Sequence, residues 1–500
     1  MARLNQITFS EVAESTERAS LSGTWRVALA CCAVSAVLGT IDALSRRHSM
    51  VPDGISYLDI SDVIRRGDWI HALNAYWAPL YPAALAVVLG ILKPSPYWEF
   101  PAAHLANSLI YLGALASFSF LLATLISYVD FAALRARAYY PLPKSVWVVL
   151  GYILFSWCSL QLIQMEHVNP DMLLSIFIYL AAAILLRIKM GSVTWQTYSF
   201  LGIVLGVGYL SKSPMFPLGI AFLITSVFAA GKPLWRGVRL GLIASVLFLA
   251  IASPFVYQIS KATGHLTFGD NALINYTSNV NLLPTYYWQK PDRSLSSRTY
   301  PAKQLFAYPA VYEFTMPWQG TYVYWYNPAE WYRGTKGKFS LRDNTRQLVE
   351  NLRAHYDLFF HMLPVATMAI IVLAVFNKMK GRSILAELYR EWILLAVPVF
   401  GLGMYTAVFF EFRHIGSLVL LFLIGLFAAV CLPRSKEERL SISAIVLGLA
   451  VMMNIQLFMS AVTSASSLHP AEFSRTADKR ENLQWQIVED LRQAGVEPGN

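Results

Sequence analysis

The chain has 500 residues, of which 56% are hydrophobic and only 14% are charged. This composition excludes an ordinary soluble globular protein, in which about a quarter of the residues are charged. Lys and Arg together number 40 against 30 Asp and Glu, which gives a formal net charge of +10. The cations lie in short loops between hydrophobic segments, so they indicate membrane topology and not a nucleic-acid-binding surface.

Long apolar segments recur along the chain and predict an all-α polytopic membrane protein with about eleven transmembrane helices. These segments do not alternate apolar and polar residues, as the strands of a membrane barrel do. The predicted spans are 25–43, 102–128, 145–163, 170–187, 196–211, 215–230, 238–258, 357–376, 392–410, 415–432 and 440–462. The cysteines at 31, 32, 158 and 431 all lie in hydrophobic segments and offer neither a disulfide framework nor metal-binding spacing.

Basic residues cluster in five connections that fall on one side of the predicted spans. These connections contain Arg135, Arg137 and Lys144; Arg187 and Lys189; Lys232, Arg236 and Arg239; Lys378, Lys380 and Arg382; and Arg434, Lys436 and Arg439. The positive-inside rule places them in the cytoplasm with the N-terminal segment 1–24, which does not resemble a cleavable signal. The C-terminus is then periplasmic.

The predicted topology divides the chain into a transmembrane core at 25–258 with its first outer loop at 44–101, an insertion at 259–356, and a second transmembrane part at 357–462. Pro and Gly interrupt the aromatic stretch 306–333, so we expect the insertion to be mixed and irregular. The periplasmic tail 463–500 predicts one amphipathic helix ending at Gly495, and a truncated αβ domain is an open alternative. Its apolar residues, expected to face inward, are Leu483, Trp485, Ile487, Val488 and Leu491.

The first outer loop predicts two helices that do not cross the membrane. The stretch 53–66 reads as a short helix after Pro52, with Asp62 pairing with Arg66 and with Ile60, Val63 and Ile64 facing the bilayer. Residues 77–92 are apolar but short and begin with prolines, which favours an interfacial or partly inserted helix.

Polar residues from four separate segments fall on the predicted outer side. They are Asp53 in the first loop; Glu166, His167, Asn169 and Asp171 before the fourth span; Lys212 after the fifth; and Glu411, Arg413 and His414 between the ninth and tenth. Ionisable residues at span ends cost free energy unless they have a partner or a function. Their shared side therefore indicates a reaction centre at the membrane surface.

Each of these residues also has a purely structural interpretation. Asp53 is placed to cap a helix, and Asp171 is placed in the first turn of one. Lys212 has the position of a side chain that snorkels to the interface. Glu411 and Arg413 are close enough to pair with each other, the two histidines suit ordinary hydrogen bonding, and the aromatic run of the insertion suits a loop core.

The functional interpretation is transfer from a phosphate-bearing lipid. Lys212 and Arg413 are suited to hold a phosphate, and Asp53 to accept the proton of an attacking hydroxyl or to hold a divalent cation. Aromatic faces suit the apolar faces of sugars. No glycine-rich phosphate loop or dinucleotide fingerprint is present, which argues against a soluble nucleotide-sugar donor.

Five short motifs keep a consistent order and side. They are Asp53-Gly54-Ile55-Ser56-Tyr57, Ala78-Pro79-Leu80-Tyr81-Pro82, Pro170-Asp171, the Gly-rich span Leu205–Lys212, and Glu411-Phe412-Arg413-His414. On these motifs the chain resembles the GT-C superfamily of polytopic glycosyltransferases, which includes the protein O-mannosyltransferases and aminoarabinose transferases. It departs from them at Gly54, where a second acid is common, and at His414, where Tyr is common.

The resemblance implies a GT-C-like fold with outer-face loop helices, in a multi-pass protein of a bacterial inner membrane. It implies a polyprenyl-phosphate-linked sugar as donor, a periplasmic active site, inversion at the anomeric carbon, and contact with membrane lipids. The implied roles are catalysis for Asp53 and Asp171; donor phosphate binding for Lys212, Arg413 and His414; and acceptor or sugar binding for Tyr57, Glu166, His167, Trp318, Tyr324 and Trp325. No cofactor is certain, and a divalent cation held by Asp53, Glu166 or Asp171 is an open alternative.

Two other functions remain open. A transporter or flippase of a lipid-linked glycan usually carries charge at mid-membrane within repeated halves, whereas this chain shows no repeat and places charge at span ends. A non-catalytic relative that binds lipid-linked sugar is the second alternative, because Gly54 leaves Asp53 as the one acid of its motif.

Overall fold

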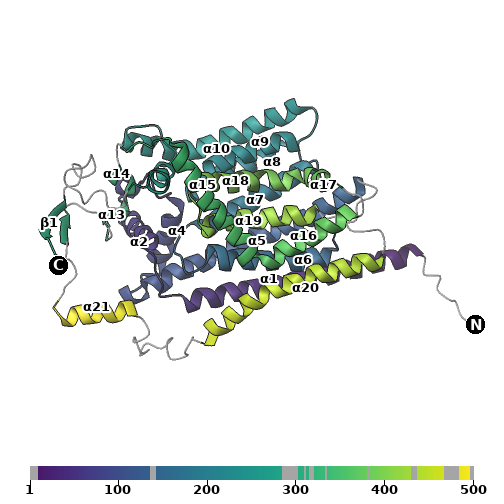
Figure 1. The fold of residues 1–500 in the computed structure, drawn as a ribbon, viewed down its shortest axis with the longest axis horizontal. Coiled ribbons are helices and arrows are strands. Elements are labelled where there is room, and N and C mark those ends of the chain that lie inside the picture. Colours follow the sequence, from purple (N-terminus) through teal and green to yellow (C-terminus); the bar gives the residue numbers. More distant parts are fainter. Residues whose placement is uncertain are drawn as a thin grey trace, which may run out of the picture.

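The computed structural model describes residues 9–135, 142–283, 302–308, 311–314, 320–321, 323–332, 335–379, 383–429, 436–466 and 483–495. Helices form nearly all of the regular structure in these ranges, and most of the long helices run side by side in one bundle (Figure 1).

The apolar segments of the sequence form the long helices of the bundle. They are α1 (Phe9–Ser45), α5 (Glu99–Arg135), α6 (Lys144–Trp157) with its continuation η2 (Cys158–Ile163), α7 (Asp171–Lys189), α10 (Leu234–Thr263) and α20 (Lys436–Ser466). Within the described residues these supply 6 helices long and apolar enough to cross a membrane, or 7 if a bent pair near residue 363 counts as one span. The chain is therefore a multi-pass membrane protein.

Shorter apolar helices complete the bundle. They are α4 (Leu80–Leu92), α8 (Trp195–Ser211), α9 (Met215–Ala229), α16 (Pro364–Met379), α18 (Trp392–Val408) and α19 (Phe412–Ala428). All eleven predicted segments are helical, but the predicted span 357–376 is broken, because the helical residues up to Met362 and those from Ala366 meet at 86°. However, α8, α9, α18 and α19 have only 15 to 17 residues. They measure about 22–26 Å, less than the roughly 30 Å hydrocarbon layer, so the count of eleven spans stays a prediction.

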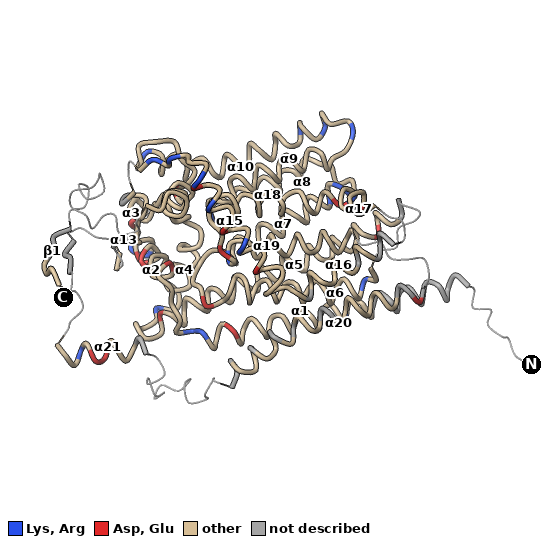
Figure 2. Tube along the Cα trace, viewed as in Figure 1, with Lys and Arg blue, Asp and Glu red and all other residues tan. Residues whose placement is uncertain are grey.

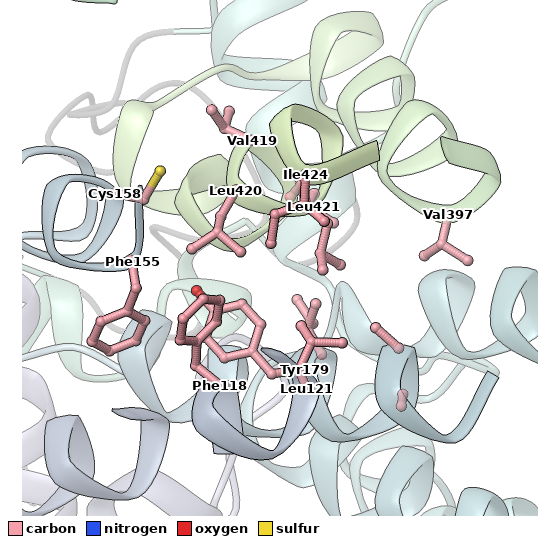
Figure 3. Packing of buried hydrophobic residues seen from close by; sticks show 14 of the residues in the cluster. Phe118, Leu121, Phe155, Cys158, Tyr179, Val397, Val419, Leu420, Leu421 and Ile424 are labelled. Carbon is pink, nitrogen blue, oxygen red and sulfur yellow. The ribbon is translucent and has the colours of Figure 1, made fainter. Parts of the chain in front are cut away.

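Aromatic and aliphatic side chains fill the centre of the bundle, where α5, α6, α7 and α19 meet (Figure 3). The rings of Phe118 and Phe155 stack with centroids 5.0 Å apart, and Tyr179 packs edge-on against Phe118. Elsewhere a small residue permits close helix contact, because a side chain at Gly202 of α8 would meet the backbone of Ala244 in α10. This packing fixes the helix ends that carry the polar residues.

Short elements cover one end of the bundle. They are α2 (Pro52–Arg65), α3 (Trp69–Ala72), η1 (Pro96–Trp98), α11 (Asn271–Asn275), η3 (Tyr276–Val280), the antiparallel strands β1 (Ala302–Phe306) and β2 (Val311–Phe314), α13 (Val323–Tyr326), α14 (Pro328–Trp331), α15 (Leu341–Tyr356) and η5 (Asp357–Met362). The remaining described helices are α17 (Ile384–Arg390) and α21 (Leu483–Gln493). Figure 2 shows the Lys and Arg of the α9–α10 connection at the end of the bundle opposite α2 and α13.

The predicted loop helix exists as α2, but two predicted details are wrong. Asp62 pairs with Arg65 at 2.8 Å, whereas the Arg66 side chain donates to the Asp62 main-chain oxygen at 3.3 Å. Ile60 and Val63, each 1% exposed, face the protein and not the bilayer. They do so because α4 offers its own apolar face to α2 in one shared core.

The tail helix α21 also exists, and Gly495 follows it with a left-handed φ of 86°. The inward direction predicted for its apolar residues is wrong, since Ile487 is 50% exposed and Leu491 is 46% exposed. The Trp485 ring packs against the Tyr97 ring, with centroids 5.2 Å apart. Residues 467–482 and 496–500 of the predicted tail lie outside the described ranges.

Candidate active site

Six residues with charged or imidazole side chains, all singled out in the sequence, line one cavity of about 480 Å³. They are Asp53 of α2, Asp171 of α7, Lys212 after α8, Glu411 just before α19, and Arg413 and His414 of α19. The cavity lies where these helix ends meet the short elements that cover the bundle. The convergence of four distant segments is the main structural finding at this site.

Asp53 is oriented by two donors from elsewhere in the chain. Its helix begins at Pro52, and the capping position is occupied by Val51, so the interpretation of Asp53 as a helix cap is wrong. Instead, Arg413 Nη1 lies 2.8 Å from Asp53 Oδ2, and the Trp325 indole donates to Asp53 Oδ1 at 2.9 Å. Each carboxylate oxygen therefore has a fixed partner.

Lys212 points inward and does not snorkel to the interface. Its Nζ lies 2.5 Å from Asp171 Oδ1, and the two side chains are only 15% and 2% exposed. Burial lowers the pKa of the Lys212 ammonium, and the Asp171 carboxylate opposes that shift. Asp171 thus stabilises a buried cation at the wall of the cavity.

Arg413 links two carboxylates. Its Nε lies 2.5 Å from Glu411 Oε2, which confirms the local pair expected from the sequence, while its Nη1 reaches Asp53. Arg413 therefore joins α19 to α2 and keeps Asp53 beside the cations of the cavity.

Several buried polar atoms around the cavity have no hydrogen-bond partner among the described residues. They are His414 Nδ1, Tyr405 Oη, Asp171 Oδ2 and Asn169 Nδ2. The His414 ring stacks on Tyr405 with centroids 5.5 Å apart. Unpaired buried polar atoms cost free energy, so these groups favour a polar ligand in the cavity.

The predicted sugar-binding residues divide into three groups. Tyr57 and Trp325 line the cavity. Glu166 and His167 do not line it. Glu166 pairs with Arg46, which directly follows α1. Burial lowers the pKa of the His167 imidazole, and the Arg413 cation adds to the shift. Trp318 and the Tyr324 side chain lie outside the described residues.

An aromatic group forms another part of the cavity lining. Tyr57 and Trp77 pack edge to face at 5.0 Å, and Trp77 contacts Trp325 at 5.8 Å. Burial raises the pKa of the Tyr57 phenol, and the nearby Asp53 carboxylate adds to the shift, so Tyr57 stays neutral. Sequence reasoning did not assign Trp77 to the site, although it lies in the same outer loop as Asp53.

Sequence reasoning also missed the uncharged polar side chains of α11 and η3, which line the cavity with the amides of Asn271, Asn275 and Asn279 and the hydroxyl of Ser278. Asn271, Asn275 and Ser278 follow one another at helical spacing. This pattern was readable in the sequence once the segment was taken as helical.

The candidate metal ligands do not come together. Among the residues that the structure describes, no three His, Cys, Asp or Glu side chains group closely enough to hold a metal ion. Asp53 and Asp171 contact different cations, and Glu166 lies outside the cavity. The residues present therefore do not form the predicted cluster.

Close packing explains why residue 54 is a glycine. A Cβ at this position would lie 2.9 Å from the Val168 Cβ atom, in the segment that leads into α7. A second acid after Asp53 does not fit without a shift of that segment, so close packing of α2 explains the departure from the superfamily motif.

Part of this chain is similar to a known protein family. Residues 117–258, which include Asp171 and Lys212, match the family model of dolichyl-phosphate-mannose-protein mannosyltransferases. No curated protein matches the chain. Similar solved structures include ArnT from Cupriavidus metallidurans bound to undecaprenyl phosphate, with 16% identity, coverage of 88% of this chain and 81% of that one, and a TM-score of 0.36. The apo state of the same protein has 14% identity, coverage of 90% and 81%, and a TM-score of 0.35.

These TM-scores are too low for residues of those structures to be assigned to this chain. The family match does not depend on those structures, because it rests on the sequence of residues 117–258. It confirms the resemblance of this chain to the GT-C membrane glycosyltransferases.

Proposed function

We propose that this protein is a membrane glycosyltransferase that moves a sugar from a polyprenyl-phosphate donor to a hydroxyl of a lipid, glycan or protein acceptor. The observation that carries the proposal is the meeting of Asp53, Asp171, Lys212 and Arg413 in one cavity. The match of residues 117–258 to the model of dolichyl-phosphate-mannose-protein mannosyltransferases supports the same chemistry.

Lys212 and Arg413 have spare donors for a phosphate. An ammonium has three N–H bonds and a guanidinium five. Among the described residues, Lys212 contacts Asp171 alone, and Arg413 uses Nε and Nη1 for its two carboxylates. The remaining N–H groups bind the donor phosphate, with His414 beside them.

Asp53 serves as the general base. It takes the proton of the acceptor hydroxyl while the acceptor oxygen bonds to the anomeric carbon of the sugar. The bond from that carbon to the phosphate oxygen breaks, and the polyprenyl phosphate leaves with the electron pair. A single displacement of this kind inverts the anomeric centre. Lys212 and Arg413 stabilise the charge on the leaving phosphate, and Asp171 holds Lys212 in place.

The cavity faces the periplasm of a bacterial inner membrane in this proposal. The Lys and Arg of the α9–α10 connection at the opposite end of the bundle support a cytoplasmic location for that end (Figure 2). The N-terminal segment 1–24 is then cytoplasmic, and the insertion 259–356 and the tail 463–500 are periplasmic.

The test is the Asp53→Asn variant in purified membranes that contain a lipid-linked sugar donor and the native acceptors. We expect sugar transfer to fall by roughly 100-fold or more, because an amide cannot take up the proton. Asp62→Asn is the matched control, since Asp62 lies on the same helix but pairs with Arg65 outside the cavity. Undiminished transfer by a folded Asp53→Asn protein would remove Asp53 from the reaction.

A further inference from the structure

One wall of the cavity is an uncharged amide surface formed by α11 and η3. Asn271, Asn275 and Ser278 lie on it at helical spacing. Within the part of the chain that the structure describes, the side chains of these three residues have no hydrogen-bond partner. We call this set the amide wall.

The amide wall is held in place from behind. The Asp270 main-chain N–H donates to the Ala75 carbonyl at 2.7 Å, and Arg346 Nη2 donates to the carbonyls of Asn279 and Val280 at 3.2 and 2.7 Å. Ile274 and Val280 are buried in the protein. The unpaired amides are therefore presented to the cavity from a fixed backbone.

The other surfaces of the cavity complement this wall. Tyr76 and Trp77 supply aromatic surfaces. Amides that donate and accept suit sugar hydroxyls, and aromatic rings suit the apolar faces of a sugar ring.

The amide wall itself carries no charged side chain. The carboxylates of the cavity lie on other elements and contact cations there: Asp53 and Glu411 share Arg413, and Asp171 contacts Lys212. A protonated amino group on a sugar at the amide wall would meet neutral amides, a hydroxyl and aromatic rings, none of which balances its charge.

We propose that the amide wall binds the sugar of the donor and that this sugar is uncharged and rich in hydroxyl groups. The inference rests on the proposed function, because it assumes a donor phosphate at Lys212 and Arg413. A sugar bonded directly to that phosphate must enter the same cavity of about 480 Å³, which the amide wall lines.

The test compares three lipids on purified protein in nanodiscs: undecaprenyl phosphate, undecaprenyl phosphate glucose, and undecaprenyl phosphate carrying 4-amino-4-deoxyarabinose. We expect the glucose lipid to bind at least about tenfold more tightly than the other two, the energy of one or two hydrogen bonds. The double variant Asn271→Leu, Asn275→Leu should lose the higher affinity for the glucose lipid. Its affinity for undecaprenyl phosphate should equal that of the natural protein.

Two further variants make the result decisive. Tyr276→Phe removes a hydroxyl from the same segment, but Tyr276 bonds to Asn344 outside the cavity, so the preference for glucose should persist. Asn275→Asp keeps the side-chain size and adds a carboxylate, so it should shift preference towards the amino-sugar lipid even if the double variant does not fold.

An unchanged preference for the glucose lipid in Asn275→Asp overturns the inference, as does preference of the natural protein for the amino-sugar lipid. Failure of the natural protein to bind undecaprenyl phosphate at all contradicts the proposed function instead.

Discussion

At the residue scale, Arg413 joins two carboxylates of the cavity, with Nη1 2.8 Å from Asp53 and Nε 2.5 Å from Glu411. Asp53, Asp171, Lys212 and Arg413 were recognisable because ionisable side chains at span ends are costly in so apolar a chain. The local pair of Arg413 with Glu411 was predictable from their spacing. The contact of Arg413 with Asp53 was not, since it depends on how α2 docks against α19.

Trp325 is another residue whose contact in the site could not be predicted from the sequence. The sequence suggested a sugar-binding ring, whereas the structure shows the indole N–H donating to Asp53. We therefore expect Trp325→Phe to lower kcat by roughly 10- to 100-fold, about 1.4–2.7 kcal/mol, with the donor KM unchanged. The phenyl ring keeps the packing against Trp77 but leaves Asp53 Oδ1 without this donor.

Steady-state kinetics with the lipid-linked donor check this prediction. Trp98→Phe is the control, because Trp98 lies in η1 and does not line the cavity. A raised KM at constant kcat would instead assign Trp325 to sugar binding.

At the element scale, the sequence predicted α2 and an irregular, aromatic-rich insertion at 259–356 but not the docking of one on the other. The main-chain N–H and hydroxyl of Thr321 both donate to the Asp59 carboxylate at 2.7 Å. Ser56 donates to the Trp325 carbonyl at 2.9 Å, and Asn74 to the Tyr326 carbonyl at 2.6 Å. Bonds from side chains to a distant main chain leave no periodic pattern, so the contacts of Asp59 could not be predicted from the sequence.

This docking places Trp325 over Asp53, and Asp59 is its polar anchor. We expect Asp59→Ala to accelerate hydrogen exchange of the 323–332 amides severalfold and to leave α5 unchanged, because the bundle core does not depend on Asp59. Asp62→Ala on the same helix is the control. Unchanged exchange at 323–332 in Asp59→Ala would show that the segment does not need Asp59 and is held by packing and by the Ser56 and Asn74 bonds.

At the scale of the whole molecule, apolar runs predicted every helix of the bundle because lipid and protein interior impose the same requirement on the backbone. Length alone did not fix the number of spans, since α8, α9, α18 and α19 are short and pack among longer helices. The cavity was not predictable from any one segment. It forms where the ends of α7, α8 and α19 meet α2, α11 and η3.

The most direct measurement is the affinity of the purified protein for undecaprenyl phosphate in nanodiscs, before and after Arg413→Gln. We expect the variant to bind at least about tenfold more weakly, because the guanidinium supplies both charge and spare N–H donors to the phosphate. Arg65→Gln is the control, since Arg65 pairs with Asp62 outside the cavity. Equal affinity of a folded Arg413→Gln protein and the natural protein would contradict a donor phosphate site in this cavity.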